Sequence, residues 1–216
     1  CQFGHSVVGG VTAATYKKPA DKALILAYTA SGICAERQAR DSRLHIQLAM
    51  ENFEALGTTR SAVATDARLN TQRLYARAAR RYQTAWNKTL SAYGLDCPKM
   101  AEKEQILYLV GLVAGNLSLI ADTAAGSVVG VPQNTVLEAA RAAKCLDNDH
   151  LLGLPNALQA VAWAMIPGSG PEGVDPWQML DESAQQGEAA GVRMARSLQV
   201  FAAANVGNDE LVKQDA

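Results

Sequence analysis

Signals for β-strands are nearly absent from this chain, because β-branched residues are scattered and apolar and polar residues never alternate for more than a few positions. An excess of positive charge is also missing: 20 basic residues stand against 21 acidic ones, and the net charge is −1. No overall field therefore attracts nucleic acid or an anionic membrane surface. Nucleic-acid binding is disfavoured, and a helical protein is indicated.

Motifs that carry catalysis are missing too. The sequence contains no G-x-S-x-G, no S-x-x-K, no phosphate-binding loop and no C-x-x-C or Cys/His cluster with zinc spacing. The best remaining candidate is the run Asp147-Asn148-Asp149-His150, where carboxylates next to an imidazole could ligate an ion or share a proton. Such runs between helices are ordinary turn and capping chemistry. We therefore expect a non-enzymatic protein with no catalytic residue, metal or cofactor.

A long apolar run is also lacking. The closest is ILYLVGLVAGNLSLIA, from Ile106 to Ala121, which is shorter than the roughly twenty residues of a membrane span and carries Asn116 and Ser118. It predicts a buried core helix.

Cysteine is scarce. Apart from Cys1, the chain has Cys34, Cys97 and Cys145. In an oxidising compartment, these three thiols allow one disulfide and one leftover thiol, and Cys97 with Cys145 is the preferred pair because both lie at predicted helix ends. The alternative is that all three are small buried apolar side chains.

Helical signals fill the rest of the sequence, and a length of 216 residues makes one domain the default. A helix is predicted to start at Pro19, and a second runs from Asp41 to Gly57. Residues 61–93 form one helix or two, ended by Gly94, and another helix opens at Pro98. Four shorter helices follow, at Asn134–Leu146, Asn156–Ile166, Pro176–Glu188 and Val192–Val206.

The last four helices contain a repeat. LQAVAWAM from Leu158 matches LQVFAAAN from Leu198, and the segments that precede them also correspond. Their helices are rich in alanine, which lets helix axes approach closely. The sequence thus predicts an all-α fold of antiparallel helical hairpins in a tetratricopeptide-like array, forming a single domain over residues 19–216.

The first ten residues, CQFGHSVVGG, begin at a cysteine. Bacterial lipoprotein signal peptides are cut immediately before a cysteine that carries a diacylglycerol. The small, polar residues that follow would serve as a tether between lipid and domain. We expect Cys1 to be the site of lipid attachment and residues 1–18 to be the tether, and the alternative is an arbitrary chain boundary.

Several motifs resemble the T-component family of TRAP transporters. They are the Leu146-Asp147 helix end, the loop GSGPEGVDPWQML, the connection at Asp209-Glu210 and the upstream helix RLYARAARRYQTAW from Arg73 to Trp86. The resemblance implies a tetratricopeptide-like, lipid-anchored periplasmic protein. Gln2 stands where an Asp usually retains a lipoprotein on the inner membrane, which favours the outer membrane. The resemblance also implies a homotrimer that binds a substrate-binding P-component. It predicts a lipidated N-terminal cysteine as well, in agreement with Cys1.

Candidate binding residues come from the few large amphipathic side chains, which suit ligand pockets and partner contacts. We selected an asparagine within an apolar helix, which needs a partner, and three aromatic residues from helices expected to neighbour it: Tyr75, Tyr108, Asn116 and Trp163. The ligand would be small and apolar. The alternative function is a helical-repeat envelope scaffold without a ligand, in which these side chains fill the core.

Overall fold

The structure, a computed structural model, describes residues 19–56 and 61–215. The predicted lipid attachment site Cys1, the tether 1–18 and His5 lie outside the described residues.

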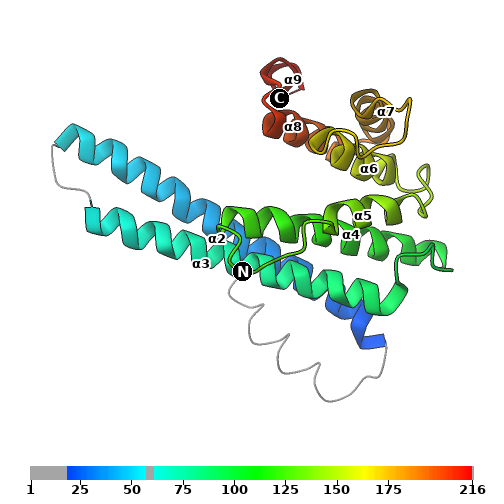
Figure 1. Cartoon of the computed structure of the whole chain (residues 1–216), viewed down its shortest axis with the longest axis horizontal. Helices are drawn as coiled ribbons and strands as arrows, with labels where there is room; N and C mark the ends of the chain where they lie inside the picture. The colour runs from blue at the N-terminus through cyan, green and yellow to red at the C-terminus, as the bar shows by residue number, and fades with distance from the viewer. Residues whose placement is uncertain (1–18, 57–60, 216) are drawn as a thin grey trace. The chain divides into compact units, whose positions relative to one another are not determined.

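The described residues form eight α-helices and no strand, so the predicted all-α class is confirmed (Figure 1). The helices are α2 (Pro19–Leu56), α3 (Ser61–Tyr93), α4 (Glu102–Ala124), α5 (Thr135–Ala143), α6 (Leu154–Met165), α7 (Pro176–Ala189), α8 (Met194–Val206) and α9 (Asp209–Asp215). The tetratricopeptide-like repeat stays a prediction, although α6 and α8 start at equivalent positions of the matched segments.

These helices belong to two compact units. Unit 1 comprises residues 1–92 and 114–133, and unit 2 comprises residues 93–113 and 134–216. Helix α4 therefore gives its first half to unit 2 and its second half to unit 1. The prediction of a single domain over 19–216 stays a prediction.

The helices predicted to start at Pro19 and Asp41 are in fact one continuous helix, α2. Gly32 makes it ambiguous from the sequence whether one helix or two cover this part of the chain. It lies inside α2 at the point where the ring of Tyr82 from α3 packs, and a Cβ atom at this position would stand 2.5 Å from Tyr82 Cε1. The glycine thus serves close helix packing and does not end the helix.

Small side chains build the core of unit 1. Buried alanines from α2, α3 and α4 surround the fully buried Tyr82, with Ala35, Ala78, Ala79, Ala85, Ala114 and Ala121 in one cluster. A second close approach occurs at Gly115, whose missing Cβ leaves room for the Trp86 indole. Alanine and glycine therefore let three long helices pack with their axes close together.

In unit 2, α6, α7 and α8 pack around Leu180, Val161 and a set of buried alanines. Asp175 caps α7 by accepting a hydrogen bond from Trp177 N at 2.8 Å, and Pro176 occupies the first turn. The preferred disulfide is confirmed, because Cys97 and Cys145 are bonded to each other. Cys34 is also disulfide-bonded, so the expectation of a leftover thiol was wrong.

Two further features differ from the sequence expectation. Helix α4 begins at Glu102 and not at Pro98, and Asp209-Glu210 forms the first turn of α9 and not a connection. Helix α4 has 23 residues and by length and composition could cross a membrane, but 56% of its apolar window is buried inside the protein. The core helix of a folded domain meets the same criteria, and the buried positions agree with the predicted core helix.

Candidate functional site

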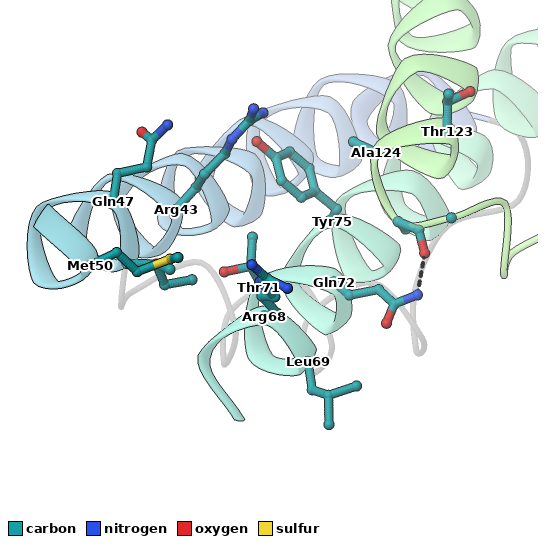
Figure 2. A pocket seen from close by; sticks show the side chains of 13 residues that line it. Arg43, Gln47, Met50, Arg68, Leu69, Thr71, Gln72, Tyr75, Thr123 and Ala124 are labelled. Carbon is teal, nitrogen blue, oxygen red and sulfur yellow. Dashed lines mark hydrogen bonds between the residues drawn. The ribbon is translucent and has the colours of Figure 1, made fainter. Parts of the chain in front are cut away.

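The candidate site is an open groove of about 590 Å³ in unit 1 (Figure 2). It lies between the end of α4 and the far half of the α2–α3 hairpin, which is the part formed by α2 from Arg43 onward and by α3 up to Tyr75. This volume lies within the range of small-molecule sites. Thirteen residues line the groove: Arg43, Ile46, Gln47 and Met50 from α2; Arg68, Leu69, Thr71, Gln72 and Tyr75 from α3; and Thr123, Ala124, Ala125 and Gly126 at the end of α4.

Helical spacing brings the first two walls together. On α2, Arg43, Gln47 and Met50 lie four and three residues apart and so share one face, and on α3 Arg68, Gln72 and Tyr75 do the same. The hydroxyl groups of Ser42 and Thr71 lie 2.9 Å apart and join the two helices in this part of the hairpin. The walls are therefore set by the register of α2 against α3.

The end of α4 closes the groove on its third side. Gln72 Nε2 donates a hydrogen bond of 2.7 Å to the carbonyl oxygen of Ala125, which Figure 2 shows as a dashed line. The loop that follows is held by the buried Asp122, whose Oδ1 accepts from Val129 N and whose Oδ2 accepts from Val131 N, both at 2.8 Å. Because both carboxylate oxygens bind backbone amides, the loop is fixed at the edge of the site.

The charged side chains among the described residues of the groove are all positive. Among the described residues that line it are two arginines, Arg43 and Arg68, and no acidic residue. Both guanidinium groups are exposed, and neither has an ion-pair partner among the described residues. The rest of the lining is mostly apolar, with Ile46, Met50 and Tyr75 among its larger side chains. The site thus offers an apolar surface with unneutralised positive charge beside it.

A buried polar network supports the hairpin next to the groove. Tyr82 donates a hydrogen bond of 2.7 Å to Glu36 Oε2, and Arg40 donates to Glu36 Oε1. Burial, with the Glu36 contact, raises the pKa of Tyr82 well above its usual value, and the hydrogen bond to Glu36 raises the pKa of Arg40. The Glu36 carboxylate thus joins α2 to α3 and pairs with Arg40.

A second groove, of about 560 Å³, also lies between α2 and α3 and shares Ile46 with the first. Asp41 and His45, four residues apart on α2, line it. No group of three or more potential metal ligands exists among the described residues.

Of the four residues selected from the sequence, only Tyr75 lines the larger groove, where it is 8% exposed. Asn116, also in unit 1, is 8% exposed, and its Oδ1 has no hydrogen-bond partner in the described part of the chain. Tyr108 and Trp163 belong to unit 2. Tyr108 is fully buried and donates to Gly94 O at 2.9 Å, while Trp163 is half-buried beneath the loop at Gly170.

The Asp147–His150 turn has a structural arrangement. Asp147 Oδ1 accepts hydrogen bonds from the backbone amides of Asp149 and His150, both at 3.0 Å. The turn is anchored to α7 through Gln186, which donates to Asp149 and accepts from Asn148. This arrangement is the turn chemistry expected as the alternative to a metal or catalytic site.

Sequence reasoning missed the two arginines. Their signal is the three-and-four spacing that places Arg43 and Arg68 on the same helix faces as Met50 and Tyr75. No protein-family model, curated protein or solved structure matches this chain.

Proposed function

We propose that this protein is a non-enzymatic, lipid-anchored periplasmic protein that acts like the T-component of a TRAP-type transport system. In this role it binds a substrate-binding P-component, and a small ligand with an apolar body is a second binding partner. The observation that carries the proposal is the far half of the α2–α3 hairpin, where the open groove lies beside exposed leucines.

Those leucines mark a surface for protein contact. Leu44 and Leu48 are 54% and 48% exposed, stand one turn apart on α2, and lie in the part of the hairpin that forms the groove. Leu69 on α3 is 44% exposed as well. Leu44 and Leu48 share one face of α2, and exposed apolar side chains on one face are typical of partner-binding surfaces. The same surface would serve self-association, including the homotrimer that the family resemblance implies.

The cysteines support the proposed compartment. The Cys97–Cys145 disulfide supports an oxidising location, such as the periplasm. Lipid attachment at Cys1 rests on the sequence alone and competes with the disulfide of Cys34, because Cys1 is the chain's one other cysteine outside the Cys97–Cys145 pair and a sulfur that carries a lipid cannot form a disulfide. Attachment to the outer membrane is also part of this proposal.

Peptide mass mapping of protein extracted from the native membrane tests the anchor. A diacylglycerol on the Cys1 sulfur is expected, whereas an unmodified Cys1, or a Cys1 sulfur found in a disulfide, would remove the anchor from the proposal. Sedimentation equilibrium at micromolar concentration tests the trimer, and a single species of 22.9 kDa at all concentrations would exclude self-association.

The partner is tested by co-purification of a TRAP P-component with the full chain from the native envelope. The paired substitutions Leu44→Glu and Leu48→Glu should abolish recovery of the P-component. Leu26→Glu and Ile33→Glu, at similarly exposed positions of α2, are the matched control and should not. Failure of the unaltered chain to retain a P-component, or equal loss with both pairs, would refute the partner surface.

A further inference from the structure

The α2–α3–α4 groove combines an apolar lining with two arginines, and this combination defines a ligand more narrowly than apolar character alone. We propose that the groove binds a small amphipathic carboxylate, with its carboxylate at Arg43 and Arg68 and its hydrocarbon body along Ile46, Met50 and Tyr75. This inference rests on the proposed ligand-binding role of the same site.

Charge complementarity is the first argument. Arg43 and Arg68 line the groove, its described lining includes no acidic side chain, and no carboxylate of the described residues pairs with either arginine. Neighbouring Arg40 differs, because Glu36 binds it. A guanidinium binds a carboxylate through two parallel hydrogen bonds, which makes an anionic head group the natural complement of Arg43 and Arg68.

The second argument is the polarity of the groove from one end to the other. Figure 2 shows Met50 and Gln47 toward one end, Thr123 and Ala124 of α4 at the other, and Arg43 and Arg68 between them. The end of α4 presents the carboxyl terminus of a helix, where backbone carbonyl groups carry partial negative charge. An anion is thus favoured beside the arginines and disfavoured at the α4 end, and this difference orients the ligand.

The third argument is the shape of the walls. The flexible side chain of Met50 and the branched side chain of Ile46, both half-buried, offer contact area to a hydrocarbon chain without requiring hydrogen bonds. Tyr75 is 8% exposed and adds only the edge of its ring to the wall. The groove is open to solvent, so a charged head group at its end would keep part of its hydration.

The test is isothermal titration of the full chain with decanoate, below the concentration at which decanoate forms micelles. Decanol, acetate and decyltrimethylammonium are the comparison ligands. Decanoate should bind most tightly, and decanol, which keeps the hydrocarbon body but lacks the carboxylate, about tenfold more weakly. Acetate lacks the hydrocarbon body and decyltrimethylammonium carries a charge that the arginines repel, so neither should bind measurably.

Variants locate the site. The double substitution Arg43→Gln and Arg68→Gln should weaken decanoate binding by about tenfold and leave decanol binding unchanged. Arg73→Gln with Arg77→Gln is the matched control: it removes the same charge from exposed positions of α3 outside the groove and should have no effect.

Equal weakening by both pairs, or decanoate and decanol binding with equal affinity, would overturn the inference. Absence of decanoate binding by a chain that still retains its P-component would refute this ligand alone. If the chain binds decanoate but retains no P-component, the ligand proposal stands and the transport role is refuted.

Discussion

Replacing Gly32 by alanine tests whether the packing of α2 on α3 has been read correctly. A Cβ atom at this position would stand 2.5 Å from Tyr82 Cε1, 2.6 Å from Cδ1 and 3.0 Å from Cγ. The Tyr82 ring has no room to retreat, because it is 0% exposed and its hydroxyl is held by Glu36. The new methyl group therefore forces α2 and α3 apart or moves the ring out of its site.

Two opposing effects set the magnitude. Alanine gains about 1 kcal/mol over glycine in a helix interior, and overpacking a tight core costs about 1–3 kcal/mol. Contacts this short against a fully buried ring place the cost in the upper half of that range. We therefore expect Gly32→Ala to lower the free energy of unfolding by about 1–2 kcal/mol, although alanine is the better helix former.

Guanidinium unfolding followed by circular dichroism measures this difference. Ala30→Gly, at an exposed position of the same helix, calibrates the helix-propensity contribution and should cost about 1 kcal/mol. In a Tyr82→Leu background, Gly32→Ala should become stabilising because the clash is gone. The reasoning is refuted if Gly32→Ala stabilises the chain that retains Tyr82.

Three further predictions concern the loop, the disulfide and a buried tyrosine. Asp122→Asn should lower the free energy of unfolding in urea by about 2–3 kcal/mol, because one carboxylate oxygen that accepts from a backbone amide becomes an amide donor. A loss below about 0.5 kcal/mol would contradict the role of Asp122 in holding the loop. Replacing Cys97 and Cys145 together by serine should lower the free energy of unfolding by about 4 kcal/mol, because the bridge closes a loop of 48 residues. The variant has no bridge here for dithiothreitol to reduce, and unchanged stability would count against this contribution. Burial, with a smaller effect of Asp96, raises the pKa of Tyr108 to about 12, so the folded state keeps this proton longer than the unfolded state, and stability present below pH 10 is lost as the pH rises toward 12. The slope is about 1.4 kcal/mol per pH unit, and Tyr108→Phe should remove this contribution; an identical pH profile for the variant would disprove it.

Local signals allowed most helices to be predicted. Proline in the first turn marks the start of α2 and of α7, and Gly94, with a φ of 77°, marks the end of α3. The continuity of α2 could not be predicted, because the role of Gly32 depends on Tyr82, which is distant in sequence. The residues that start or end a helix act locally, whereas the structural role of a glycine inside a helix depends on the side chain that packs against it.

The candidate site was less predictable than the fold. Choosing large amphipathic residues selected Tyr75, which lines the groove, but also Tyr108, which is fully buried and bonded to a backbone carbonyl. Arg43 and Arg68 look like ordinary solvated charges in the sequence. They share a groove only because of the register between α2 and α3, which single-helix periodicity does not specify.

The division of α4 between two units has a consequence for dissecting this protein. The chain passes from unit 1 to unit 2 after residue 92, returns at residue 114 and leaves again after residue 133. A truncation after residue 92 leaves unit 1 incomplete, and a truncation after residue 133 keeps all of unit 1 together with residues 93–113 of unit 2. A fragment ending at residue 92 would retain Arg43, Arg68 and Tyr75 but lack the α4 segment that receives the Gln72 hydrogen bond. A complete groove therefore requires a chain that runs at least to residue 133. The α2–α3 hairpin transplanted alone would contain the two arginines but lack the third wall of the groove.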